Sequence, residues 1–215
     1  CLAGPAGAAL EYPVPPEPPA FSIAHPRHPL LLHDRPGGKP VAFVSERTEF
    51  GSRPALAVVK VHGRWLGVTA TELPNRRLGW VRRGDVRLSS THLSLRVDLS
   101  HRLLVLERNG IPVRRMKVGV GRSGSPTPVG RSAVTDKLSG SRYGPYYGCC
   151  ILALSSHQTN LPVGWTGGDR IAIHGTNAPA SIGAAASAGC LHAGDGDLRF
   201  LLRRIPLGTP VFIHS

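Results

Sequence analysis

The stretch from Ile171 to His192, IAIHGTNAPASIGAAASAGCLH, constrains the fold of this chain more than any other. It opens with alternating apolar residues, which predicts a half-buried strand that ends at His174. A loop of small residues at 178–189 then lets the backbone fold back tightly and ends at Cys190. A strand and a returning loop can bring a His and a Cys together. Thiol chemistry needs such a pair, because the imidazole lowers the thiol pKa and moves its proton.

The small residues around this pair add a second signal, because their spacing follows a known pattern. The pattern is a strand ending in His-Gly-Thr, then Ile-Gly, then Ser-x-Gly-Cys and an apolar residue. The matching residues are His174, Gly175, Thr176, Ile182, Gly183, Ser187, Gly189, Cys190 and Leu191. This pattern resembles the signature of the L,D-transpeptidases of the bacterial cell wall, the YkuD-type catalytic domain. Two positions depart from it: Ala188 replaces the usual His, and His192 replaces the usual Arg.

The resemblance extends over about 93 to 213 and implies a mechanism for the pair. Cys190 would attack the carbonyl that links the third and fourth residues of a donor stem tetrapeptide. His174 would act as the base, and the carbonyl of Gly175 would orient its imidazole. A turn bracketed by Gly can point two amides at one oxygen, so the N–H groups of Gly189 and Cys190 are candidates for the oxyanion hole.

Further residues are candidates for substrate contact, each with a structural alternative. Ser187 would support the substrate or bond within its loop. Thr176, in the His-Gly-Thr run of the motif, is also a candidate for substrate contact. His192 would inherit the carboxylate contact of Arg, with a charge that fades across neutral pH, or only pack locally. Tyr146, with Tyr143 and Tyr147, would line a cleft or form a structural aromatic corner.

The cysteines separate into two kinds. Cys190 has the alternative of a buried structural thiol, but its place in the motif favours the nucleophile. Cys149 and Cys150 are adjacent and cannot easily satisfy disulfide geometry, so we expect unpaired packing residues, although export would permit a disulfide. The His and Cys residues show no zinc spacing, so we expect no metal and no cofactor.

The charge of the chain indicates its kind of partner. Lys and Arg outnumber Asp and Glu by 26 to 13, and the isoelectric point is about 10.8. Such charge favours a polyanionic partner. The basic residues are scattered without an interleaved aromatic platform, so the expected partners are the cell wall and its stem peptides, not nucleic acid. The resemblance also implies reaction with carbapenem-type inhibitors.

The chain divides into three expected segments. Residues 1–20 are rich in Pro and Ala and predict an extended tether. Cys1 would be a lipidated N-terminus of an exported envelope protein after removal of a signal peptide, or an arbitrary boundary. Residues 21–90 show short apolar runs between turn clusters, resemble bacterial SH3-type domains and predict a small β-barrel. Residues 93–215 would form the catalytic β-sandwich or barrel with short helices.

Local patterns predict several elements, within a fold that 20 Pro and 26 Gly mark as mainly β. Asn109-Gly110 predicts a hairpin turn, and Asp195 starts a helix that Pro206 ends. The final run, Gly208 to Ile213, predicts an edge strand. Trp65 and Trp80 would pack in the N-terminal barrel, with a peptidoglycan stacking platform as the alternative.

Two other functions compete with a transpeptidase. Water could resolve the same acyl-enzyme, which would make the chain an L,D-carboxypeptidase. A transpeptidase-like domain that has lost its activity could also serve as a cell-wall-binding module. The intact pair of His174 and Cys190 argues against the second alternative.

Overall fold

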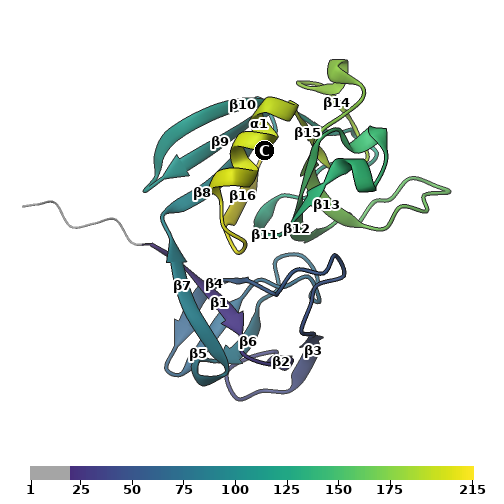
Figure 1. Cartoon of the computed structure of the whole chain (residues 1–215). Coiled ribbons are helices and arrows are strands. Elements are labelled where there is room, and N and C mark those ends of the chain that lie inside the picture. Colours follow the sequence, from purple (N-terminus) through teal and green to yellow (C-terminus); the bar gives the residue numbers. More distant parts are fainter. Residues whose placement is uncertain (1–19) are drawn as a thin grey trace, which may run out of the picture.

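A computed structural model describes residues 20–215 and shows a mainly β chain, as the sequence predicts (Figure 1). The described residues form two sheets, one α-helix and a few short 3₁₀ turns. The tether predicted for residues 1–20 lies, apart from Ala20, outside the described residues, as does Cys1. No helix within residues 20–215 is both long and apolar enough to cross a membrane.

The N-terminal sheet has seven strands and its own apolar core. Its strands are β1 (Phe21–Pro26), β2 (Leu30–His33), β3 (Pro40–Val44), β4 (Leu56–His62), β5 (Trp65–Val68), β6 (Gly79–Arg82) and β7 (Val86–Thr91). Their order is β3-β2-β6-β5-β4-β1-β7. Leu32, Leu66 and Val68 are at most 1% exposed in its core. The likeness to SH3-type domains stays a prediction.

The C-terminal strands form a closed barrel. They are β8 (Leu93–Asp98), β9 (Leu103–Arg108), β10 (Ile111–Gly121), β11 (Gly130–Ser139), β12 (Cys150–His157), β13 (Arg170–His174), β14 (Ala185–Ser187), β15 (Leu191–Ala193) and β16 (Pro210–His214). Their order is β14-β10-β15-β13-β12-β11-β16-β8-β9, and β9 also pairs with β10. Eight strands therefore close on themselves, and β14 is attached outside the ring through β10.

The barrel core explains why these segments adopt this arrangement. Alternate residues of β8 and β9 point inward, and Leu95, Val97 and Leu104 are fully buried there. The helix α1 (Asp195–Arg204) buries Leu198 and Leu201 in the same core. Acidic residues occupy its first turn and basic residues its last, as the helix dipole favours.

Two local predictions have different outcomes. The hairpin is confirmed: Asn109 and Gly110 join β9 to β10 with φ of 56° and 77°, the left-handed values that a two-residue turn requires. The edge position of the last strand is wrong, because β16 lies between β8 and β11. Its only proline, Pro210, is the first residue of the strand, where a missing N–H is tolerated.

The two sheets pack directly against each other. Thr91 ends β7 and Leu93 begins β8, so the chain passes from one sheet to the other without a long linker (Figure 1). The rings of Phe21 and Phe212 lie 5.9 Å apart across the interface. The Asn75 amide donates to the carbonyl of His157 at 2.7 Å. The division at 21–90 and 93–215 follows the two sheets, but their independent folding stays a prediction.

The two tryptophans of the N-terminal sheet are both partly buried. The Trp80 ring covers Gly67, where an added Cβ would meet it at 3.2 Å. The Trp65 and His33 rings pack edge to face with their centroids 5.3 Å apart. The Arg82 guanidinium lies over the Trp65 ring, also 5.3 Å from its centroid. These contacts fit the packing role that we expected, and the stacking platform stays untested.

Candidate active site

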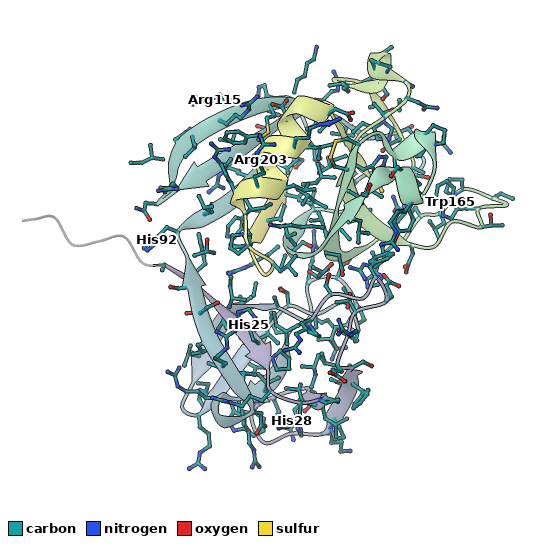
Figure 2. All side chains as sticks on the ribbon, in the orientation of Figure 1. His25, His28, His92, Arg115, Trp165 and Arg203 are labelled. Atoms are coloured by element: carbon teal, nitrogen blue, oxygen red, sulfur yellow. A yellow bond between two sulfur atoms is a disulfide. The ribbon has the colours of Figure 1, made fainter. Side chains whose placement is uncertain are left out.

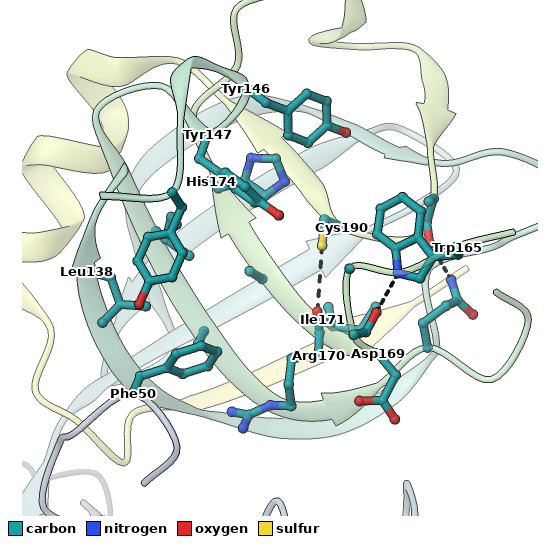
Figure 3. Close-up of a pocket in the computed structure, with 18 of the residues that line it drawn as sticks. Phe50, Leu138, Tyr146, Tyr147, Trp165, Asp169, Arg170, Ile171, His174 and Cys190 are labelled. Carbon is teal, nitrogen blue, oxygen red and sulfur yellow. Dashed lines mark hydrogen bonds between the residues drawn. The ribbon is translucent and has the colours of Figure 1, made fainter. Parts of the chain in front are cut away.

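The predicted pair lies on adjacent strands of the barrel. His174 ends β13, and Cys190 immediately precedes β15, which runs parallel to β13. Both residues line one pocket with a volume of about 210 Å³. Figure 3 shows the imidazole and the thiol on the wall of this pocket, with Trp165 beside the thiol. The fold thus brings together the two residues that the motif identified.

The imidazole of His174 is buried and held in one tautomer. Its exposed fraction is 1%, and its Nδ1 lies 2.6 Å from the carbonyl oxygen of Gly175. A carbonyl can only accept, so Nδ1 carries the proton and Nε2 keeps its lone pair. Burial lowers the pKa of His174 to about 4, with a further decrease from His192 and a small opposing effect of the Gly175 hydrogen bond. The imidazole is therefore neutral at pH 7 and available as a base.

The thiol of Cys190 is also neutral at pH 7. Cys190 is unpaired and partly buried, and its Sγ donates to the carbonyl oxygen of Arg170 at 3.8 Å. Burial raises the pKa of Cys190 to about 11, and a hydrogen bond from the backbone of Ala172 offsets only part of this effect. The resting pair is a thiol and an imidazole, not a thiolate and an imidazolium.

The turn before the nucleophile is closed by Ser187. Its hydroxyl donates to the carbonyl oxygen of Cys190 at 2.6 Å and accepts the N–H of Gly189 at 3.0 Å. Of the two roles proposed for Ser187, the structure shows the bond within the loop. The Gly189 amide, a candidate for the oxyanion hole, thus already has an acceptor in this structure. Gly189 has a φ of 122°, which other residues rarely adopt.

Two residues outside the Cys loop fix its position. The buried Gln158 amide donates to the carbonyl oxygens of Pro126 and Ala188 at 3.1 and 2.8 Å. The Thr127 hydroxyl donates to the carbonyl oxygen of Gly189 at 2.8 Å. Thr127 belongs to a Thr-Pro-x-Gly run in the sequence, but Gln158 stands in a polar stretch without any motif. Sequence reasoning therefore missed Gln158.

His192 is buried, its ring lies 4.8 Å from the His174 ring, and it does not line the pocket. Ser181 donates its hydroxyl proton to the Ala178 carbonyl at 2.7 Å, so His192 Nδ1 donates to Ser181 Oγ at 2.7 Å. The Tyr146 hydroxyl then donates to Nε2 at 3.5 Å. Burial lowers the pKa of His192, so the ring is neutral at pH 7. These contacts favour local packing over the carboxylate contact that we also considered.

The remaining predicted residues divide between the pocket and its surroundings. Tyr143, Tyr146 and Tyr147 all line the pocket, and the Tyr147 ring lies 4.9 Å from the His174 ring. Burial raises the pKa of Tyr146 and of Tyr147, and the nearby Cys190 adds to the increase. Thr176 lies outside the pocket lining and accepts the N–H of Ala178 at 3.0 Å. Its proposed contact with substrate stays a prediction.

The expectation for the adjacent cysteines is wrong. Cys149 and Cys150 form a disulfide, and their Cα atoms are 3.7 Å apart. In the turn before β12, Gly148 has a φ of 57° and lies against Gly175. The Cys150 carbonyl accepts the N–H of Gly175 at 3.1 Å, so the disulfide adjoins the residue that orients His174.

The described residues contain no cluster of His, Cys, Asp or Glu that could hold a metal ion.

Comparison with known proteins relates the C-terminal part of the chain to a family. The family model described as the L,D-transpeptidase catalytic domain matches residues 94–213. A Bacillus subtilis protein that carries the family's name, YkuD, is 30% identical over 120 residues. The match covers 55% of this chain and 63% of YkuD, so the chain spans less than two thirds of that relative.

Solved structures of the same family resemble the chain at low identity. One is L,D-transpeptidase 3 from Mycobacterium tuberculosis in complex with a faropenem-derived adduct, at 13% identity and a TM-score of 0.48. That match covers 89% of this chain and 95% of the other. Another is the transpeptidase LdtMt1 in complex with imipenem, at 15% identity and a TM-score of 0.48, covering 93% and 100%.

Proposed function

The chain belongs to the L,D-transpeptidase catalytic domain family, and on that premise we propose that it cross-links peptidoglycan stem peptides through a Cys190 acyl-enzyme. The observation that supports this most is the shared pocket of Cys190 and His174, with Nδ1 of the imidazole occupied by the Gly175 carbonyl. That bond leaves Nε2 as the base for the thiol proton.

The first half-reaction forms the thioester. The thiol turns from the Arg170 carbonyl toward His174, and Nε2 takes its proton as Sγ attacks the carbonyl between the third and fourth donor residues. The C–S bond forms and the C–N bond breaks. The imidazolium returns the proton to the leaving amine, and the terminal D-residue departs. Because thiol and imidazole both begin neutral, transfer of the thiol proton to Nε2 has to precede or accompany the attack.

The second half-reaction transfers the acyl group. A side-chain amine of an acceptor stem attacks the thioester, and Nε2 of His174 accepts a proton from this amine. The C–N bond forms, the C–S bond breaks, and the proton returns to Sγ. Water in place of the amine would yield a hydrolysed tripeptide, the carboxypeptidase outcome.

The oxyanion of each tetrahedral intermediate needs nearby N–H donors. The Gly189 N–H donates to Ser187 Oγ at 3.0 Å, so it could donate to the oxyanion only after this bond to Ser187 breaks. We therefore assign the first donor position to the N–H of Cys190 itself. The Tyr146 hydroxyl, which lines the pocket, directs its proton to His192 and would need to turn before it could donate.

The charge of the chain fits a place in the cell envelope, and we propose that the protein is exported. The chain has 26 Lys and Arg residues and 13 acidic ones, and this excess of positive charge favours association with an anionic wall. Arg115 on β10 and Arg203 on α1, both labelled in Figure 2, are exposed basic residues of the C-terminal part.

Reaction with a carbapenem tests the acyl-enzyme. The strained lactam carbonyl is an acyl donor for the same thiol, so intact-protein mass should increase by one inhibitor molecule, with the adduct on Cys190 in peptide mapping. The variant Cys190→Ala should show no adduct. An adduct on another residue in that variant would show that the nucleophile is wrongly assigned.

Muropeptide analysis tests the transfer. Incubation of the protein with purified tetrapeptide stems should release the terminal D-residue and give dimers linked between third-position residues. The matched control is Cys190→Ala at equal concentration. Tripeptide without dimer would favour the carboxypeptidase, and unchanged stems together with no carbapenem adduct would favour the wall-binding alternative.

A further inference from the structure

The pocket is not built by the barrel alone. Phe50 lies on the connection between β3 and β4 of the N-terminal sheet, yet it lines the pocket with Cys190 and His174. Figure 3 shows its ring at one end of the pocket, with the imidazole and the thiol beyond it. One wall of the site thus comes from the segment that precedes the catalytic domain in the sequence.

The connection that carries Phe50 is a hydrogen-bonded turn anchored to the barrel. The Gly51 N–H donates to the Thr48 carbonyl at 2.9 Å, and the Ser52 N–H donates to Thr48 Oγ1 at 3.0 Å. The Thr48 hydroxyl donates to Asp136 Oδ1 at 2.5 Å, and Asp136 is fully buried on β11. This turn therefore holds Phe50 in a defined place against the pocket.

A second anchor lies next to the nucleophile. Glu49 Oε1 accepts from Arg170 Nη1 at 2.5 Å, and the Arg170 side chain is only 12% exposed. The other nitrogens of this guanidinium donate to the Leu154 carbonyl and to Thr135 Oγ1, at 2.7 to 3.0 Å. The guanidinium is thus committed to protein acceptors, while the carbonyl of the same residue accepts the Cys190 thiol.

Aromatic contacts continue from this wall to the base. The Phe50 and Tyr143 rings meet edge to face at 6.3 Å, and Tyr143 meets Tyr147 in the same way at 6.2 Å. Tyr147 in turn packs on His174 at 4.9 Å. Such pairs contribute beyond the area that they bury. Phe50 therefore supports the aromatic side of the pocket as well as forming part of it.

We propose that Phe50 is a specificity-determining residue of the catalytic pocket, supplied by the N-terminal sheet to hold the donor peptide. The lining next to Phe50 is mainly apolar and aromatic, and the Arg170 guanidinium, 5.6 Å from the Phe50 ring, is bonded to Glu49. This wall therefore suits an apolar part of the donor stem and not a carboxylate. This inference rests on the proposed function, and its tests include one that does not depend on that function.

Steady-state kinetics with a tetrapeptide donor test the role of Phe50. Phe50→Ala should raise KM by roughly threefold to tenfold, as expected for loss of one aromatic contact, and leave kcat within about twofold. The control is Phe43→Ala, because Phe43 is an exposed residue of the neighbouring strand β3 and does not line this pocket. Equal kinetics for the two variants, or a fall in kcat alone, would overturn the proposal.

Thiol alkylation separates this inference from the proposed function. Wild type and variants react with iodoacetamide and with the bulkier N-cyclohexylmaleimide, and peptide mapping quantifies modification of Cys190. Removing a wall should raise the ratio of bulky to small reagent rates in Phe50→Ala by at least about twofold and leave Phe43→Ala unchanged. An unchanged or lower ratio would overturn the inference, even for a protein that never forms an acyl-enzyme with stem peptides.

Both measurements require that the Phe50 variants are folded. Thermal unfolding of Phe50→Ala should stay cooperative, because the ring is only partly buried. If that variant does not fold, Phe50→Leu keeps the apolar bulk while losing the aromatic edge. It should raise KM less than Phe50→Ala is expected to, but more than Phe43→Ala. Kinetics of Phe50→Leu equal to wild type would then contradict the proposal.

Discussion

His174 Nδ1 lies 2.6 Å from the carbonyl oxygen of Gly175, the residue that follows it in the chain. The bond fixes the tautomer, because the carbonyl has no proton to give. Gly175 itself lies in a tight place, because an added Cβ would meet Asp195 Oδ1 at 2.6 Å and Gly148 Cα at 2.8 Å. The backbone carbonyl of Gly175 thus determines which nitrogen of His174 accepts the thiol proton.

Replacement of His174 should remove the base without removing the nucleophile. His174→Ala should slow acylation by a carbapenem roughly 100- to 10,000-fold, the usual contribution of general base catalysis. The pKa of His174 is lowered to about 4, so wild-type acylation should stay near its maximum as pH falls from 7 to 5. Stopped-flow measurement of lactam opening gives both results. A loss of rate centred near pH 6.5 would show that the imidazole titrates as an exposed His does.

The same pKa predicts how stability depends on pH. Below pH 6.5 His174 is protonated in the unfolded chain, whereas in the folded chain it stays neutral until about pH 4. The contribution of the neutral imidazole to folding stability is therefore present at pH 7 and is lost as pH falls from 6.5 to 4. The difference between these pKa values corresponds to roughly 3 kcal/mol. Urea unfolding of wild type and His174→Gln at pH 7 and pH 4 isolates it, since the variant lacks the titrating group. Parallel decreases in both proteins would contradict the assignment.

The raised pKa of Cys190 makes a separate prediction for the free protein. With a pKa of about 11, the thiolate fraction should grow about tenfold for each pH unit between 7 and 10. Alkylation of Cys190 by iodoacetamide, followed by peptide mapping, should follow this slope. A rate that is already constant near pH 7 would indicate a thiolate–imidazolium pair at rest.

Much of the fold could be predicted because its signals are local. The turn at Asn109-Gly110 depends on two adjacent residues, and α1 begins at Asp195, as its acidic first turn indicates. The place of β16 could not be predicted in this way. Its pairing with β8 joins Val211 to Leu95, far apart in the chain, and no residue near Val211 encodes that partner.

The site was predictable where a motif carried it. His174 and Cys190 were identified by the match of the strand and loop to the L,D-transpeptidase motif, and the role of Gly175 was implied by that resemblance. Phe50 could not be found from sequence, because it comes from the other sheet and only packing brings it to the pocket. The pairing of Cys149 with Cys150 was also missed, since adjacency alone argues against a disulfide.

Gln158 should support the position of the nucleophile through its two donor bonds. Gln158→Glu keeps the size of the side chain but presents an oxygen to the carbonyls of Pro126 and Ala188. We expect a loss of about 1–3 kcal/mol in unfolding free energy and slower acylation, with Gln158→Ala no worse than Gln158→Glu. Chemical unfolding and carbapenem kinetics at pH 7 measure both. Wild-type stability in Gln158→Glu would show that these bonds contribute little.

The fragment 93–215 should fold without the N-terminal sheet, but with lower stability and an incomplete pocket. Its core is its own, since the buried cluster from Leu95 to Ile213 lies within the fragment. Deletion would remove the Thr48 bond to Asp136 and the Glu49 bond to Arg170, and it would expose the fully buried Asp136 to water. We therefore expect cooperative unfolding at a lower temperature and acylation of Cys190 by a carbapenem, together with a raised KM for donor stems.

Circular dichroism during heating, intact-protein mass and donor kinetics test these results against the full chain. A fragment that shows no cooperative transition would mean that the two sheets depend on one shared core, and a fragment with an unchanged KM would mean that the barrel alone binds the donor.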